Sequence, residues 1–318
     1  LLHQVESLLA AAAAQPARRA FADGGYYVLG QDFGAPREVK LVADAGPLGY
    51  LSIAAHGHAD ALAFTLCAGG REILVDSGTY AYHRQGRWRD YFRGTAAHNT
   101  LRVDGEDQSL PGGNFLWLRH ARARCELFES DARRDLFVGV HDGYMRLRDP
   151  VRHRRRIELD KRGPRIEVRD TLECAGEHFV ELHWHLAEDC AARIAGHGVE
   201  VDSAGVHLRI DCPRELEAPR IVVGCDDPPL GWISRGLDRK TPSPTIVCAG
   251  RIAGGASLRT TFLFVDRWSE RTTPSGEREG FLGLPPGAPG LLGLEVMRST
   301  STTGRRRRAS NPVLIRSN

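Results

Sequence analysis

Several features that would point to particular protein classes are missing from this chain. No apolar run is long enough to cross a membrane, and no segment has the pattern of a secretory signal peptide. The seven cysteines are widely spaced, form no CxxC motif and are odd in number, so a cysteine-only zinc site is not expected. The formal net charge is only +3, which gives no general electrostatic reason to expect nucleic acid as a partner.

The composition is that of an ordinary globular protein. The 318 residues are 42% hydrophobic and 26% charged, which is enough apolar material for a substantial core. Two basic runs are local, at residues 152–156 and 304–310. Acidic residues follow the first run, so it is interpreted as a solvated strand face, and the second falls in a tail rich in Gly, Ser, Thr and Arg.

The order of short segments predicts an all-β fold. From about residue 26 to residue 265, short strand-like runs alternate with Gly, Pro, Asp and Asn turns, and no segment of ten residues is helical in pattern. This organisation predicts a large antiparallel β-sandwich over 21–267. An Ala-rich amphipathic helix is expected within 1–20, where the chain begins with Leu as if it continued a longer protein. A poorly ordered tail is expected over 268–318.

The segment from His56 to Asn99 concentrates the usable chemistry. It contains His58, Asp76 and His98, and two neutral imidazoles with one carboxylate are a ligand set that suits zinc with an open fourth position. If HGH lies on a strand, His56 and His58 point to the same face. The following runs predict a hairpin whose second strand ends near Asp76. The alternative is that each of these polar residues only caps a turn or a strand end.

Aromatic and basic side chains surround the three metal-competent residues, and such a mixture suits a sugar ring that carries negative charge. They are Tyr80, Tyr82, Trp88, Arg89, Tyr91 and Arg93. Core packing is the alternative for Tyr80 and Trp88, and a surface ion pair is the alternative for the arginines. His183 and His185 have apolar flanks and are interpreted as sandwich residues, with His185 as a spare ligand should His98 fail.

Three long motifs carry a resemblance to a known family. They read HGHADALAF, VDSGTYAY and WRDYFRGTAAHNTLRVDGEDQS. In these segments the chain resembles the C-terminal domain of heparinase II/III-like polysaccharide lyases. The resemblance implies a β-sandwich that follows an (α/α) toroid, with the N-terminal helix as its remnant. It also implies β-eliminative cleavage of an acidic, uronate-containing polysaccharide, such as heparan sulfate or alginate.

The resemblance also implies roles for individual residues. His58, Asp76 and His98 match zinc ligands, His56 matches a residue near the substrate carboxylate, and Tyr80 matches a tyrosine that faces the groove. His56 and Tyr80 are therefore the catalytic candidates. The candidates for substrate binding are Trp88, Arg89, Arg93 and Asn99.

Other functions stay open at this point. The family's main proton-transfer groups lie on the toroid, so a non-catalytic carbohydrate-binding or structural sandwich is the alternative. A metallohydrolase, in which zinc activates water, is a third hypothesis. Relatives of this type are exported by bacteria, so the resemblance implies the periplasm. The sequence does not indicate the polysaccharide, endo or exo action, or the oligomeric state.

Overall fold

Antiparallel strands make up most of the molecule, as the sequence predicts. The computed structural model describes residues 19–83 and 86–265. Within that part the α-helix is α2 (Gly86–Arg93), and no described helix is long and apolar enough to cross a membrane. The helix expected within 1–20 and the tail expected over 268–318 fall outside the described residues, apart from Arg19 and Ala20.

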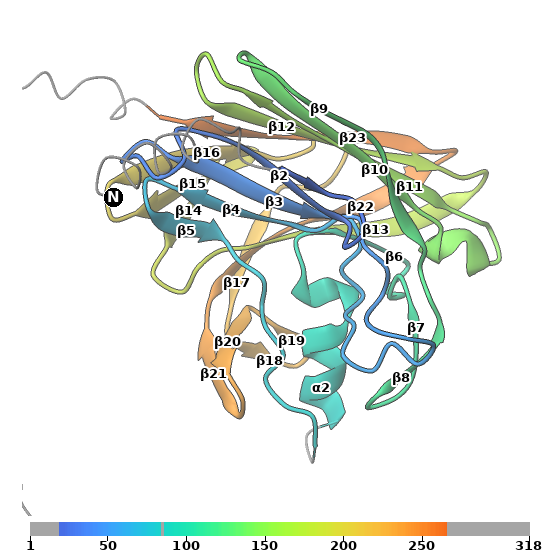
Figure 1. Ribbon diagram of the computed structural model, residues 1–318. Helices are drawn as coiled ribbons and strands as arrows, with labels where there is room; N and C mark the ends of the chain where they lie inside the picture. Colours follow the sequence, from blue (N-terminus) through green and yellow to red (C-terminus); the bar gives the residue numbers. More distant parts are fainter. Residues whose placement is uncertain (1–18, 84–85, 266–318) are drawn as a thin grey trace, which may run out of the picture. The chain divides into compact units, whose positions relative to one another are not determined.

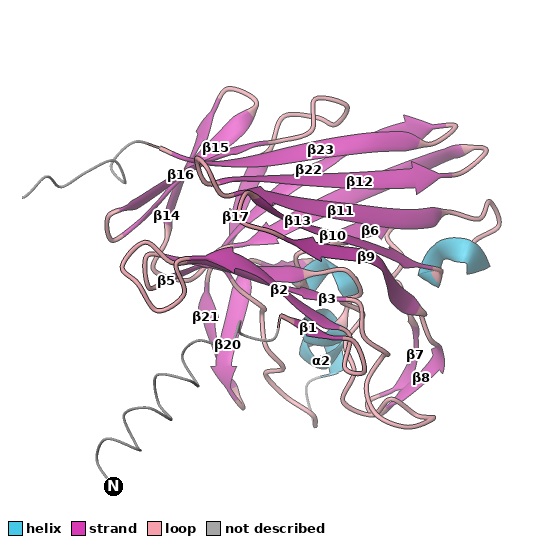
Figure 2. Cartoon of the chain, turned by 45° about the horizontal axis from the view of Figure 1, so that its top comes forward, coloured by secondary structure: helices cyan, strands magenta, loops and turns pink. Residues whose placement is uncertain are grey.

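An eight-stranded antiparallel sheet forms one layer (Figures 1 and 2). Its strand order is β14-β15-β16-β23-β12-β11-β10-β9. The strands are β9 (Ala123–Ser130), β10 (Arg134–His141), β11 (Arg152–Asp160), β12 (Arg165–Glu173), β14 (Ala191–Ala195), β15 (Gly198–Ser203), β16 (Val206–Asp211) and β23 (Ala256–Phe264).

Two smaller sheets face it. One has the order β1-β2-β3-β4-β5 and the other the order β17-β22-β13-β6. They meet edge to edge where Leu74 pairs with Leu186 and where the Val75 amide donates to the His185 carbonyl at 2.9 Å. The strands are β1 (Ala20–Phe21), β2 (Tyr26–Gln31), β3 (Val39–Asp44), β4 (Phe64–Ala68), β5 (Arg71–Leu74), β6 (Leu101–Val103), β13 (Glu177–His185), β17 (Arg220–Val223) and β22 (Pro244–Ala253).

One aromatic cluster joins all three sheets in the core. Phe64 of β4, Trp184 of β13 and Phe262 of β23 are almost fully buried, and their ring centroids lie 5.3–6.0 Å apart in edge-to-face contacts. Large aromatic side chains bury much apolar surface and gain further from this geometry. The sandwich is therefore a single hydrophobic core shared by the eight-stranded sheet and the two smaller ones.

The basic run at residues 152–156 is only half solvated, so the prediction of a solvated strand face was wrong for alternate residues. His153 and Arg155 are completely buried, because β11 turns every second side chain toward the core. Asp170 of the adjacent β12 compensates both of them. It accepts from His153 Nε2 at 2.7 Å and from Arg155 Nε at 2.7 Å.

The helix and three small hairpins lie below the sheets in Figure 1. Helix α2 was missed from the sequence because its eight residues give barely two turns of periodicity. It packs through Tyr91 and Phe92 against Leu230 and Val247. The hairpins are β7–β8 (Leu110–Gly113 and Leu116–Arg119), β18–β19 (Cys225–Asp226 and Pro229–Leu230) and β20–β21 (Trp232–Gly236 and Arg239–Pro242).

Candidate functional site

The structure brings His58, Asp76 and His98 together into one cluster, called the metal trio below. One ligand atom from each lies within 4.8 Å of the other two. His98 Nδ1 is 2.7 Å from Asp76 Oδ2, and the His58 and His98 ring centroids are 5.2 Å apart. The convergence predicted from the sequence is therefore present in the geometry.

The trio comes from loops rather than strands. The HGH segment does not lie on a strand. Residues 51–56 form successive turns, so strand alternation does not relate His56 to His58. The predicted hairpin of β4 and β5 is present, and Asp76 follows its second strand. His98 follows a 3₁₀ turn, Thr95–Ala97. Strand ends and loops deliver polar groups to one place while the sheets behind them stay rigid.

Backbone hydrogen bonds hold these loops in position. Asp76 Oδ1 accepts from the Gly78 amide at 2.8 Å, and Gly78 has a φ of +79° in a place where a Cβ would lie 2.2 Å from the Ser234 carbonyl. Only glycine fits that turn without strain. The His58 loop is tied to the 3₁₀ turn because Thr95 Oγ1 donates to the Ala59 carbonyl at 2.9 Å.

Asn99 holds the loops together and does not face a substrate, contrary to its predicted role. Its side chain is buried, and Nδ2 donates to the carbonyls of Phe64 and Val75, both at 2.9 Å. Its Oδ1 accepts from the His185 amide at 2.6 Å. Both amide hydrogens are thus used inside the protein, which leaves none for a sugar.

Protonation differs between the members of the metal trio. Burial opposes charge on His98, but the Asp76 carboxylate outweighs burial and raises the pKa of His98 to about 9. Burial and the positive charge of His98 lower the pKa of His58 to about 3. Burial would raise the pKa of Asp76, yet the charge of His98 holds it well below its usual value. At neutral pH without metal, His58 is neutral and His98 and Asp76 form an ion pair.

The trio fits a zinc ion. His98 Nε2 is buried without a hydrogen-bond partner among the described residues, and His58 Nε2 lies 3.4 Å from Thr79 Oγ1, a long contact that a metal ion could replace. Two imidazoles and one carboxylate are a common protein ligand set for zinc and leave one position for water or substrate. Because ligands must be deprotonated, a metal here would displace the proton of His98.

A cavity of about 360 Å³ opens beside the metal trio. Its wall includes Tyr26, Asp44, His56, His58 and Asp60. Burial raises the pKa of Asp44 to about 6 and that of Asp60 to about 7. Sequence reasoning missed both carboxyls. Asp60 stands inside the HGHAD motif and could have been found there, whereas Asp44 ends a distant strand and carries no local signal.

His56 is exposed next to an aromatic shelf made by Tyr82 and Phe115. Its ring lies edge-on to Tyr82 at 5.4 Å, and the Tyr82 and Phe115 rings stack at 5.7 Å. Phe115 comes from the turn of β7–β8 and was not predicted. Stacked aromatic faces next to a polar ring are well suited to a sugar, whose C–H faces pack on aromatic surfaces while its hydroxyl groups hydrogen-bond.

The two arginines of α2 have different environments. Arg93 bonds mainly within the protein, since it pairs with Asp90 at 2.7 Å and donates to the Gly113 carbonyl at 2.6 Å. Arg89 is almost fully buried and lies 5.0 Å from the Tyr82 ring centroid. Its Nη1 and Nη2 have no hydrogen-bond partner among the described residues. Among the described residues, Arg89 thus keeps both terminal nitrogens unpaired for an anionic ligand, whereas Arg93 keeps only Nε unpaired.

Tyr80, Trp88 and Tyr91 lie in a satellite hydrophobic cluster around α2. Tyr80 is 7% exposed and its ring packs on Phe92 with centroids 5.3 Å apart. Trp88 is half-buried and has the Lys240 ammonium 3.8 Å from its ring centroid. Packing therefore accounts for much of their environment, as the alternative interpretation of Tyr80 and Trp88 proposed.

His183 and His185 are sandwich residues, as predicted. Both are buried on β13. The His185 ring lies 3.0 Å from Thr245 Oγ1 through Nδ1 and 3.0 Å from the Ala96 carbonyl through Nε2. These contacts use both ring nitrogens, so His185 supports the turn before His98 and is not needed as a replacement ligand.

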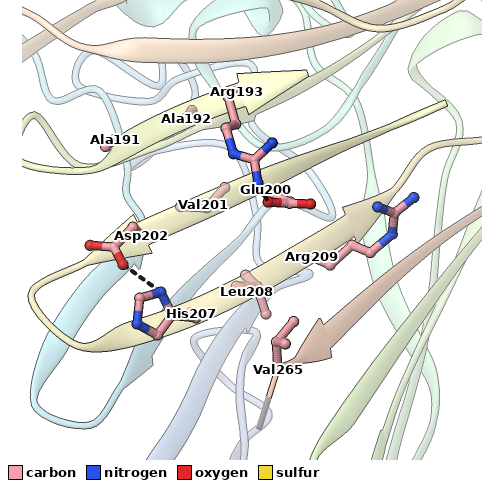
Figure 3. Close-up of a pocket in the computed structure, with 10 residues that line it drawn as sticks. All are labelled: Ala191, Ala192, Arg193, Glu200, Val201, Asp202, His207, Leu208, Arg209 and Val265. Carbon is pink, nitrogen blue, oxygen red and sulfur yellow. Dashed lines mark ion pairs between the residues drawn. The ribbon is translucent and has the colours of Figure 1, made fainter. Parts of the chain in front are cut away.

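A further cavity, of about 600 Å³, lies on β14, β15 and β16 (Figure 3). Its charged side chains are largely paired with each other, Arg193 with Glu200 and His207 with Asp202. These four residues offer no unpaired charge to an acidic ligand. The cavity beside the metal trio is therefore the better candidate for a functional site.

Comparisons with known proteins show the family to which the chain belongs. The sequence model described as "Heparinase II/III-like, C-terminal" matches residues 13–261. A heparin-sulfate lyase of Bacteroides thetaiotaomicron is 26% identical over 195 residues, which are 59% of this chain and 25% of that enzyme. The chain thus spans about a quarter of the length of that relative.

Solved structures show the same fold. Heparan sulfate lyase HepC from Pedobacter heparinus matches with a TM-score of 0.62 and 18% identity, over 81% of this chain and 38% of that one. A structure titled as a heparinase III gene product gives the same TM-score and identity, over 79% of this chain and 36% of its own. Both matches thus cover little more than a third of the solved chain.

Proposed function

Because the chain belongs to the heparinase II/III-like family through its C-terminal domain, we propose that it forms the metal-holding, substrate-facing half of a polysaccharide lyase. The substrate class we propose is a uronate-containing polysaccharide. The observation that carries the proposal is the metal trio itself, whose His58 lies in the wall of a cavity that also presents His56.

β-Elimination makes three demands on a site. The uronate carboxylate must be stabilised so that the neighbouring C5 proton becomes acidic, a base must remove that proton, and an acid must protonate the leaving O4. His56 is exposed at the cavity and is our candidate for a hydrogen bond to the carboxylate. Nη1 and Nη2 of Arg89, which have no hydrogen-bond partner among the described residues, would supply a two-point donor for a carboxylate or a sulfate.

The metal trio serves mainly to hold the site in shape in this proposal. A zinc ion bound there would add a fixed positive charge and fasten the His58 loop to the Asp76 turn. His56 lies two residues from His58, so the position of its imidazole depends on that loop. Tyr80, whose ring packs on Phe92, would position substrate from the loop that follows Asp76.

Incubation with candidate polysaccharides tests the proposal. The full-length gene product, loaded with zinc, is mixed with heparan sulfate, alginate or a neutral glucan, and the ultraviolet absorbance of the unsaturated uronate is followed. We expect absorbance to rise with an acidic polysaccharide only, and to fall strongly in His56→Ala. New reducing ends without the unsaturated product would show a hydrolase. Saturable binding without cleavage would support the carbohydrate-binding alternative.

A further inference from the structure

A second cluster of metal-competent side chains lies away from the metal trio. Asp149, Cys174 and His178 each place one ligand atom within 4.8 Å of the other two. His178 is the second residue of β13, and His185 near the metal trio ends that strand. Seven residues of extended strand separate the two by about 24 Å. This cluster therefore belongs to a different region of the molecule.

We propose that Asp149, Cys174 and His178 form a second zinc site, which fastens the eight-stranded sheet to the four-stranded sheet. Cys174 directly follows β12 of the first sheet, and His178 lies in β13 of the second. A thiolate, an imidazole and a carboxylate are ligands that zinc accepts together, whereas calcium and magnesium prefer oxygen ligands alone. Three protein ligands leave the fourth position to water.

The imidazole of His178 is already oriented for this role. The ring is 4% exposed, Nδ1 lies 2.7 Å from Asp104 Oδ2 and Nε2 lies 2.9 Å from Asp149 Oδ2. Metal-bound histidines commonly donate their other ring N–H to a carboxylate, which fixes the tautomer. Asp104 is such a partner, and its Oδ1 is itself held by the Phe179 amide at 2.9 Å.

The turn between Cys174 and His178 is shaped around Asp149. The Gly176 amide donates to Asp149 Oδ2 at 2.6 Å, and a Cβ on Gly176 would lie 2.9 Å from the same oxygen. The Gly176 carbonyl accepts from the Gly254 amide at 2.9 Å, which fixes the turn against the β22–β23 connection. The carboxylate is thus positioned by backbone before any ion binds.

The imidazole of His178 and the carboxylate of Asp149 need only a small separation to admit the ion between them. Zinc ligands about 2.0–2.1 Å from the metal at tetrahedral angles lie about 3.3 Å from each other. His178 Nε2 and Asp149 Oδ2 are 2.9 Å apart, so they must separate by a few tenths of an ångström. The alternative is a metal-free imidazolium of His178 held between Asp104 and Asp149. A zinc site requires the Cys174 thiolate as a ligand, whereas the metal-free arrangement does not.

Cobalt substitution separates the two descriptions. The zinc-free chain is titrated with Co²⁺, and the sulfur-to-cobalt charge-transfer absorption is recorded. Because the metal trio contains no sulfur, this band cannot come from the metal trio, and the Cys174→Ser variant tests whether it comes from the Cys174 site. We expect the band in the unaltered chain and in His58→Ala, its loss in Cys174→Ser, and its retention in Cys225→Ser as the matched control.

Metal content gives a second readout. We expect two zinc ions per chain, one in Cys174→Ser and one in His58→Ala, with Asp104→Asn binding the second ion about 10- to 100-fold more weakly. Circular dichroism checks that each variant is folded. If a variant of the second site does not fold, Asp149→Asn takes its place in the metal measurement. Absence of the sulfur band, its persistence in Cys174→Ser, or zinc content unchanged by that substitution would overturn the proposal. Failure of lyase activity would leave these results unaffected.

Discussion

Arg155 of β11 donates a 2.6 Å hydrogen bond to the backbone carbonyl of Asn99, the residue that directly follows His98. The same guanidinium donates to the Leu62 carbonyl at 2.8 Å and pairs with Asp170 through two hydrogen bonds. A charged side chain in the middle of the sandwich thus anchors two loops of the candidate site. These hydrogen bonds fix the loops that carry the metal trio to the eight-stranded sheet.

Replacing Arg155 should therefore destabilise the whole domain. Arg155→Met leaves the Asp170 carboxylate buried with His153 as its remaining described partner, and breaking a buried pair costs about 3–5 kcal/mol. Equilibrium urea unfolding measures the loss. Arg154→Met is the matched control, because Arg154 is 43% exposed and its pairing with Glu126 should contribute less than about 1 kcal/mol. Equal effects of the two substitutions would contradict the anchoring role.

Removing one ligand should release the metal and loosen the site. His58→Ala takes one imidazole from the metal trio, so we expect lower zinc content and a lower Tm than in the unaltered chain. Elemental analysis and thermal unfolding, with and without a chelator, measure both. His56→Ala is the control, since it should impair activity with metal content unchanged. Full zinc occupancy at the metal trio in His58→Ala would rule out the ligand assignment.

The buried histidine chain behind Asp170 should make the domain sensitive to acid. The Gly143 amide donates to His141 Nδ1 at 3.1 Å, so the proton of His141 is on Nε2, which donates to His153 Nδ1 at 2.9 Å. Burial, reinforced by the neighbouring charge of Arg155, lowers the pKa of both histidines. Both rings are therefore neutral in the folded protein.

The sign of the pH effect follows from these lowered values. The unfolded chain takes up protons near pH 6.5 and the folded chain does not, so stability is complete above that pH and falls as the pH decreases below it. Each histidine contributes a slope of up to about 1.4 kcal/mol per pH unit. Urea unfolding between pH 7.5 and 5 should be less pH-dependent in His141→Gln. His207→Gln, the same substitution at a partly exposed site, is the variant for comparison.

Arg89 should contribute to the binding of acidic sugars. In the part of the chain that the structure describes, its terminal nitrogens are buried without acceptors. Hydrogen bonds to charged groups are worth about 1.5–3 kcal/mol, so Arg89→Leu should weaken binding about 10- to 100-fold. Calorimetry with uronate oligosaccharides measures the change. Arg87→Leu alters an exposed arginine of the same helix and should have little effect. A neutral oligosaccharide should not distinguish the variants, and equal losses for the acidic and neutral ligands would point to a folding defect instead.

The sequence predicted the sandwich because strand alternation is a local property, repeated many times along the chain. It also identified His58, Asp76 and His98, since their motifs are close in sequence. It failed where the deciding contact is remote. Arg155 looks like a surface residue until Asp170 is seen across the strand pair, and Asp149 meets His178 only because a loop returns to the start of β13.

The two smaller sheets meet at the Leu74–Leu186 pair, and this seam fixes one part of the candidate site more firmly than another. Asp76 leaves the seam two residues after Leu74, whereas Phe115 of the aromatic shelf sits at the tip of the β7–β8 hairpin. The position of Asp76 is thus set by paired backbone, whereas the position of Phe115 depends on the conformation of a hairpin tip. A change in the length of that hairpin would therefore alter the aromatic shelf, while the geometry of Asp76 would stay set by the place where the two sheets join.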